Sequence, residues 1–181
     1  VRIAADRFLP NRSQRRVNQA HADLVVRILK PAFVTAHYEL YIAYQRQRHA
    51  GGGMDQDNVE QYEQFLLQSR VNSRMVEFWR ESPDGDQLLM VSIIDVLSDG
   101  ISAVYTFYDP QVKSGLGTFN MLWQIAQAKS LGLPYIYLGY WIEKSPKMNY
   151  KRQFEGQEHL IDGEWLAVSR QPVPRRTNSF D

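Results

Sequence analysis

Residues 95–150 constrain the fold most, because they contain a complete strand, loop, helix and second strand. β-Branched and aromatic residues predict a strand at 101–108, and Asp109-Pro110 ends it because proline has no N–H for the ladder. Apolar residues then recur at helical spacing over 116–131, and a second apolar strand is predicted at 134–142. Two strands joined by one helix are most simply adjacent, parallel and connected by a right-handed crossover.

The loop before this helix is the first place to look for a ligand. It lies at the carboxyl end of the sheet and contains Gly115 and Gly117. Backbone N–H groups at a helix start attract an anion, and glycine lets a phosphate approach closely. The same two glycines would also suit a simple tight turn, so both interpretations stay open.

The first 70 residues are predicted to be mainly helical. An irregular basic arm is expected at 1–12, followed by a helix that Ser13 caps and Pro31 ends. His21 on this helix is expected to be a partly buried, satisfied histidine rather than a ligand. A second helix starts at Thr35 and ends at the glycines 51–53, and a capping box at 57–60 opens a third, with Val59, Tyr62, Phe65 and Leu66 inward.

Residues 71–170 are predicted to form a mixed sheet with helices. Strands at 74–80 and 87–97 flank a turn at 83–85, and a turn at 98–100 leads into the strand at 101–108. A helix near 146–154 and two short strands around Asp162-Gly163 complete the domain. Residues 171–181 are expected to be a disordered tail.

Composition indicates one soluble domain. A chain of 181 residues with 44% hydrophobic residues can bury one substantial core. The longest apolar run, 88–97, is interrupted by Ser92 and Asp95 and is too short to cross a membrane. The arginine-rich start lacks the apolar stretch of a signal peptide. Because there is no cysteine, disulfides and thiolate metal sites are excluded within this chain, and a reducing, cytoplasmic location is expected.

Charge is nearly balanced at +1 but unevenly distributed. Basic residues outnumber acidic ones over 1–30, and a second basic cluster with Lys144, Lys147, Lys151 and Arg152 follows the last predicted parallel strand. Two separated basic patches would suit phosphate contacts, although a solvated charged surface gives the same pattern.

Several runs are long enough to indicate a family. They are RSQRR at 12–16, RHAGGGM at 48–54, IIDVLSDG at 93–100, SAVYTFYDP at 102–110, SLGLPYIYLGYWI at 130–142 and KMNYKRQFEGQE at 147–158. These runs resemble the carboxyl-terminal domain of the bacterial arginyl-tRNA–protein transferase family, in its branch of aspartate/glutamate leucyltransferases. The resemblance implies an α/β fold with a mixed sheet, similar to the GNAT acyltransferases. Family members carry a cysteine-rich module before the point where this sequence starts, so we expect a longer protein.

The resemblance implies transfer of leucine from leucyl-tRNA to the N-terminal amine of proteins that begin with Asp or Glu, which marks them for N-degron proteolysis. Arginine is the alternative transferred residue. A GNAT acetyltransferase that uses acyl-CoA is a second alternative, although the spacing from Gln111 to Gly115 is one residue longer than the usual pyrophosphate loop. A non-catalytic domain that binds acidic N-termini is a third. Neither a cofactor nor a metal is expected.

The proton acceptor has two candidates. Strand alternation puts Asp95 on the same face as Val91 and Ile93, and a carboxylate on an apolar face usually has a partner or a task. Asp95 is therefore a candidate catalytic residue, or a structural acid bonded to the turn at Ser98. Glu143, just beyond the last parallel strand, is the second candidate.

Separate sets of binding residues are expected for the acceptor protein and for the tRNA donor. An acidic first residue of the acceptor needs a cation, and the expected residues are Arg12, Arg15 and Arg16, whose other possible roles are phosphate binding or surface charge. The expected residues for the tRNA donor are Tyr105, Phe107, Leu116, Gly117, Thr118, Lys147, Tyr150 and Lys151.

Overall fold

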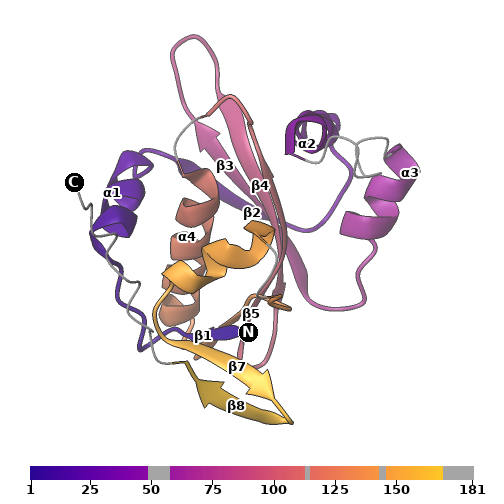
Figure 1. The fold of residues 1–181 in the computed structure, drawn as a ribbon. Helices are drawn as coiled ribbons and strands as arrows, with labels where there is room; N and C mark the ends of the chain where they lie inside the picture. The colour runs from indigo at the N-terminus through magenta and orange to yellow at the C-terminus, as the bar shows by residue number, and fades with distance from the viewer. Residues whose placement is uncertain (49–57, 113–114, 143–145, 169–181) are drawn as a thin grey trace, which may run out of the picture.

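Two groups of helices cover the two faces of one mixed sheet (Figure 1). In this computed structural model the described residues are 1–48, 58–112, 115–142 and 146–168. The sheet has eight strands in the order β2-β3-β4-β5-β6-β1-β7-β8. The strands are β1 Arg2–Ala4, β2 Val25–Leu29, β3 Ser73–Arg80, β4 Gln87–Val96, β5 Gly100–Tyr108, β6 Tyr135–Tyr137, β7 Gln157–Ile161 and β8 Glu164–Ala167.

The helices fall into two layers. One face is covered by α1 Arg12–Ala20, α4 Leu116–Ser130 and the 3₁₀ helix η3 Pro146–Gln153. The opposite face is covered by α2 Thr35–Arg48, α3 Val59–Tyr62 and the π-helix η2 Glu63–Leu67. Across the described part of the chain, no helix combines the length and the apolar character that a membrane crossing requires.

The predicted parallel pair is confirmed. β5 and β6 pair in parallel from Gly100 with Tyr135 to Ser102 with Tyr137. A Cβ atom at Gly100 would lie 2.6 Å from the Tyr135 carbonyl oxygen, so glycine permits this close approach. β6 ends earlier than the predicted strand at 134–142, because Gly139 has a left-handed backbone with φ of 72° that an extended strand cannot hold.

The predicted irregular arm at 1–12 is wrong for its first residues. Arg2–Ala4 forms β1, which lies between β6 and β7 and pairs antiparallel with both. Ile3 and Ala4 are buried there, and this burial offsets the entropy lost when a chain end becomes ordered. The amino-terminal segment is therefore an interior part of the sheet.

The first predicted helix is too long and has the wrong cap. α1 is capped by Asn11, whose side chain accepts from the Gln14 amide in a complete capping box, and it ends at Ala20. Residues Val25–Leu29 form an edge strand against β3, because β-branched residues here favour the ladder over a helix. His21 is buried and packs on Phe119, with ring centroids 5.2 Å apart, as expected for a core histidine.

The other predicted elements are largely present. The second helix starts at Thr35, the strands on both sides of residues 83–85 pair antiparallel, and β7 and β8 flank Asp162-Gly163. Of the residues expected inward in the third helix, Tyr62 and Leu66 are buried, whereas Val59 in the first turn of α3 and Phe65 in the π-helix are exposed. The predicted helix end at 51–53 and the tail at 171–181 lie outside the described residues.

Each face of the sheet has its own hydrophobic core. The core under α1 and α4 includes Ile3, Phe8, Phe78, Ile94, Leu122 and Ile136. The core under α2 and α3 contains Tyr41, Tyr62, Leu66, Met75, Val91, Ile93 and Phe107. The second core is rich in aromatic rings.

A buried ion pair fixes β1 to β7. The Arg2 guanidinium donates to the Glu158 carboxylate at 2.7 Å, and Arg7 donates to the other carboxylate oxygen. Arg2 also lies over the Tyr135 ring, 3.5 Å from its centroid. Burial alone would raise the pKa of Glu158, but the hydrogen bonds from the two arginines outweigh it and leave that pKa below its ordinary value of 4.5.

The lowered pKa of Glu158 predicts a defined acid sensitivity. Its ionised form stabilises the fold above pH 4.5, and this contribution is lost as the pH falls through the lower folded-state pKa. The difference in the free energy of unfolding between wild type and Glu158→Gln should therefore shrink as the pH falls below 4.5. Urea denaturation at several pH values measures it. Glu164→Gln, at an exposed site on β8, is the control, and an equal pH effect in that variant would contradict the assignment.

Candidate functional site

The two parallel strands part shortly after they meet. Pairing between β5 and β6 stops at Ser102. Immediately after it, the ladder between β5 and β4 contains a bulge, where Ile93 pairs with Tyr105 and Ile94 pairs with Ala103. A bulge increases the local twist and turns the strand away from its neighbour. From Ala103 to Tyr108, β4 is the only strand that pairs with β5 in the described part of the chain. Beyond Ser102, therefore, no ladder pairing joins β5 to the chain that follows β6 among the described residues, and we call this unpaired interval the gap.

A buried lysine supports the other side of this gap. The Lys151 ammonium, from η3, donates to the Leu138 carbonyl at 2.8 Å and also to the Tyr140 carbonyl. These carbonyls flank Gly139, where the strand has ended. Burial lowers the pKa of Lys151. A lysine predicted to bind the donor thus fixes the backbone that diverges from β5.

The start of α4 lies beside the end of β5. Gly115 has a left-handed φ of 62°, and no side chain caps the helix, so the first N–H groups of α4 are not used by a cap. A Cβ at Gly117 would lie 3.8 Å from the Tyr108 ring, which places the helix start against the last residue of β5. Thr118 accepts a long hydrogen bond of 3.5 Å from Gln153 of η3. An anion site at this helix start stays a prediction.

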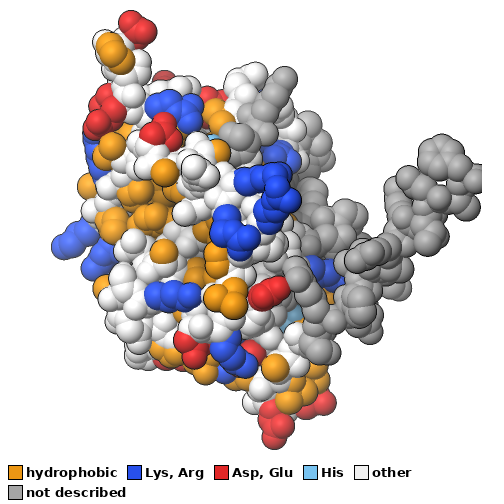
Figure 2. Space-filling view, turned by 90° about the vertical axis from the view of Figure 1, so that its left-hand side faces the viewer, with side chains coloured by type: hydrophobic (Ala, Val, Ile, Leu, Met, Phe, Trp, Pro, Cys, Tyr) orange, Lys and Arg blue, Asp and Glu red, His pale blue; other side chains and the backbone are white. Residues whose placement is uncertain are grey.

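The arginine-containing run at residues 12–16 of α1 lies close to η3 and to the start of α4. Gln14 donates to the Gln153 carbonyl at 3.0 Å, and Val17 lies against the Cβ position of Gly115. Arg12, Arg15 and Arg16 are all exposed, and Arg15 donates to the Pro10 carbonyl at 2.6 Å. Figure 2 looks onto this face and shows Lys and Arg side chains grouped near its middle. The structure thus brings the arginine run, the start of α4 and η3 together.

The predicted proton acceptors are only partly described. Asp95 is half-buried and accepts from the Ser73 hydroxyl on β3, rather than from the turn at Ser98. It lies on β4, which β5 separates from the gap. Glu143 and the side chain of Lys147 lie outside the described residues, and Tyr150 is partly exposed. The catalytic role of Asp95 therefore stays a prediction.

The predicted donor residues Tyr105 and Phe107 face the opposite side of the sheet from α4. Phe107 packs against Tyr41 of α2 with ring centroids 5.5 Å apart, and Tyr105 packs against Phe65 at 5.2 Å. Sequence reasoning missed the polar residues at the end of α2 next to this cluster. Gln45 is fully buried, and Arg48 donates to the Tyr108 hydroxyl at 2.7 Å. The helical spacing of Tyr41, Gln45 and Arg48 was the available signal.

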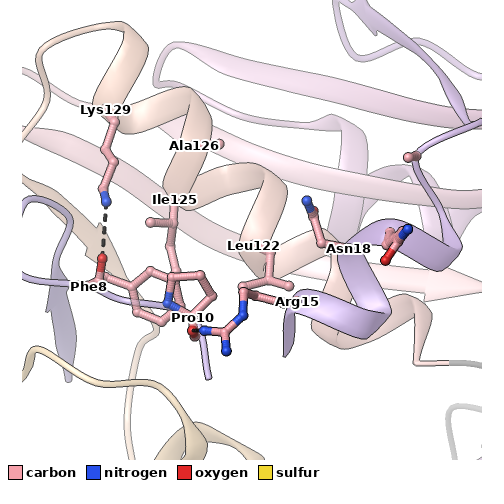
Figure 3. A pocket seen from close by; sticks show the side chains of 10 residues that line it. Phe8, Pro10, Arg15, Asn18, Leu122, Ile125, Ala126 and Lys129 are labelled. Atoms are coloured by element: carbon pink, nitrogen blue, oxygen red, sulfur yellow. Dashed lines mark hydrogen bonds between the residues drawn. The ribbon is translucent and has the colours of Figure 1, made fainter. Parts of the chain in front are cut away.

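A hollow of about 430 Å³ lies between α1 and α4 (Figure 3). The Lys129 ammonium donates to the Phe8 carbonyl at 3.1 Å on its rim. Its lining is mainly apolar and comprises Phe8, Pro10, Arg15, Asn18, Gln19, Ala22, Leu122, Ile125, Ala126 and Lys129. Because the hollow lies on the α1 side of α4 and the sheet on the other, it is separate from the gap between β5 and β6. No cluster of three or more His, Asp or Glu able to hold a metal occurs among the described residues.

Solved structures resemble this fold. The structure of L-PGS from Bacillus licheniformis superposes with a TM-score of 0.55 at 11% identity, covering 81% of this chain and 48% of that chain. The C-terminal domain of a putative lysylphosphatidylglycerol synthetase from Agrobacterium fabrum superposes with a TM-score of 0.54 at 9% identity, covering 76% and 45%. At such low identity the likeness shows the fold alone, which is the expected GNAT-like acyltransferase fold.

Curated relatives are much more similar in sequence. An aspartate/glutamate leucyltransferase of Polynucleobacter necessarius is 52% identical over 93% of this chain and 68% of its own length. Those of Thiobacillus denitrificans and Rhodopseudomonas palustris are 52% and 40% identical, over 69% and 72% of their lengths. The family profile for the arginine-tRNA-protein transferase C terminus matches residues 36–161. The chain therefore belongs to the arginine-tRNA-protein transferase family of aminoacyltransferases, alongside relatives named aspartate/glutamate leucyltransferases.

Proposed function

We propose that this protein transfers leucine from leucyl-tRNA to the N-terminal amine of proteins that begin with Asp or Glu. The observation that carries the proposal is the parting of β5 and β6 beside an uncapped helix start, in a chain about half identical to leucyltransferases. The product is then a substrate for N-degron proteolysis. Because charged tRNA is the donor, the reaction belongs in the cytoplasm.

The chemistry requires alignment more than a dedicated nucleophile. The neutral α-amine of the acceptor attacks the ester carbonyl of the aminoacyl-tRNA, an amide bond forms, and the ester bond to the terminal ribose oxygen breaks. The amine loses a proton, and the ribose oxygen gains one. Backbone N–H groups along the β5 edge that β6 does not pair beyond Ser102 are proposed to stabilise the oxyanion that develops at the carbonyl. Asp95 or Glu143 is the proposed proton acceptor.

The donor side is proposed on the α4 face. The N–H groups at Leu116, Gly117 and Thr118 favour a phosphate at the helix start, and the positive end of the α4 dipole adds to them. Lys147 of η3 is proposed to contact the tRNA end with Tyr150, whereas the buried ammonium of Lys151, which donates to the Leu138 and Tyr140 carbonyls, is proposed to act by holding this backbone. Tyr105 and Phe107, which lie on the opposite face of β5 from α4, are proposed to pack against the aminoacyl group.

Arg12, Arg15 and Arg16 are proposed, from the sequence, to bind the acidic first residue of the acceptor protein. A guanidinium can bind a carboxylate through two parallel hydrogen bonds, which suits an acidic first residue. Their position beside the start of α4 equally favours contacts with tRNA phosphate. Single variants of these arginines distinguish acceptor binding from phosphate binding.

Arginine is the second candidate for the transferred residue, because the matching family profile describes an arginine-tRNA-protein transferase. Leucine is favoured because curated relatives that are about half identical to this chain are named leucyltransferases.

A transfer assay tests the proposed function. Full-length protein should add leucine from leucyl-tRNA to peptides beginning with Asp or Glu, and mass spectrometry of the product locates the added residue. A peptide beginning with Ala is the acceptor control, and arginyl-tRNA and acetyl-CoA are the donor controls. Preferred use of arginyl-tRNA would favour the second candidate. Acetylation, or no product with any donor, would contradict aminoacyl transfer.

Single variants of the basic residues separate acceptor binding from tRNA binding. An acceptor residue changed to Ala should cost about 1.5–3 kcal/mol in transfer to acidic peptides, with tRNA affinity unchanged. A phosphate-binding residue should weaken tRNA binding for every acceptor and flatten its dependence on salt. We expect the first result for at least one of Arg12, Arg15 and Arg16, and the second for Lys147. Wild-type transfer by all four variants would refute both placements.

Gly117→Ala tests the helix start without disturbing the fold. The added methyl makes ordinary contact with Tyr108, and alanine favours a helix over glycine by up to ~1 kcal/mol, so stability should stay constant or rise. The methyl should nevertheless hinder a phosphate at the backbone and weaken leucyl-tRNA binding about tenfold. Ala126→Gly on the same helix should show the reverse: lower stability and unchanged tRNA binding. Normal affinity in Gly117→Ala would exclude a phosphate there.

A further inference from the structure

The end of α2 carries polar groups that the proposed reaction does not yet use. His37, Tyr41 and Gln45 are the buried residues of α2, and their spacing of four residues puts them on one stripe facing the sheet. His37 contacts Glu77 of β3 at 2.6 Å, and Tyr41 packs on Phe107 of β5. The helix therefore crosses the sheet from β3 to β5.

This path carries Gln45 beyond β5 toward the gap. Four residues advance a helix by about 6 Å, and neighbouring strands are about 4.8 Å apart, so the turn after Tyr41 extends past β5. At the level of Phe107 no strand follows β5 on that side, because β6 pairing stopped at Ser102. The end of α2 thus lies over the end of β5, where Tyr44 and Arg48 contact Tyr108.

The side chain of Gln45 makes no hydrogen bond to a described residue through either of its polar atoms. Its side chain is fully buried, yet neither its amide nitrogen nor its amide oxygen has a partner. An unsatisfied buried polar group is costly and rare in native proteins, so it calls for an explanation. An amide that can both donate and accept matches the N–H and C=O groups at the start of a peptide.

One turn later, Arg48 supplies a positive charge. Its guanidinium donates to the Tyr108 hydroxyl at 2.7 Å and lies 5.6 Å from the centre of that ring. Arg48 is exposed and forms no ion pair with a described carboxylate. The other side of Tyr108 faces Gly117 at the start of α4. Tyr108 therefore lies between the Arg48 guanidinium and the proposed phosphate site at the start of α4.

We propose that Gln45 and Arg48 form the acceptor subsite, in which Arg48 binds the side-chain carboxylate of the first residue and Gln45 binds its α-amine and peptide carbonyl. The inference rests on the proposed function and deepens it. The acceptor then approaches from the α2 face of the sheet, and the tRNA end from the α4 face. With Arg48 in this role, the arginines of α1 take their alternative role of phosphate binding, and their Ala variants would weaken tRNA binding for every acceptor instead of transfer to acidic peptides alone.

Arg48→Met is the direct test, in full-length protein with leucyl-tRNA and a peptide beginning with Asp. The KM for this peptide should rise about 10- to 100-fold, the scale of a lost charged hydrogen bond, while tRNA affinity and its salt dependence stay unchanged. Arg48→Lys should recover only part of the loss, because an ammonium cannot bind a carboxylate through two parallel bonds. Arg46→Met, exposed on the same turn of α2, is the matched control and should behave as wild type.

Gln45→Met separates binding from folding, since it removes both unsatisfied atoms at nearly constant volume. The thermal midpoint should stay constant or rise, whereas kcat/KM should fall at least tenfold for acidic peptides. A normal KM in Arg48→Met, an equal defect in Arg46→Met, or full activity in Gln45→Met would overturn the inference. Inactive wild-type protein would instead overturn the proposed function.

Discussion

The interrupted pairing of β5 with β6 is the constraint on which the rest of the structure depends. Gly100 allows the strands to approach closely, and pairing ends at Ser102, just before the bulge that twists β5 away. Lys151 then binds the carbonyls of the diverging chain. A continuous sheet would satisfy more backbone groups, so the open edge is retained at some cost in stability. The proposed reaction uses this edge.

Packing on both faces holds the opening in place. Under α4, Asn120 donates to Thr106 of β5, Thr106 bonds Ser92 of β4, and Gln124 donates to Ser92, so a buried polar network fixes the helix to the strands beside the gap. On the other face, aromatic rings hold α2 to β5. The two faces meet at Tyr108, which contacts both α2 and the start of α4.

The parallel strands and their connecting helix followed from residues 95–150, because turn residues and apolar periodicity are local signals. β1 and β2 were missed because they gain stability from partners far away: Arg2–Ala4 pairs with β6 and β7, and Val25–Leu29 with β3. The candidate site residues stay predictions, and only some of their signals can be read from a sequence. Glycines and basic runs are visible in a sequence, whereas the unpartnered amide of Gln45 is apparent only once the chain is folded.

The central claim is that transfer takes place in the gap between β5 and the chain after β6. A crystal structure with a non-hydrolysable 3′-leucylamido-adenosine tests it most directly. The account predicts that the leucyl amide lies beside the free edge of β5, between Ala103 and Tyr108, with the adenosine toward the start of α4. Binding of the analogue in the hollow between α1 and α4, with the gap empty, would contradict it.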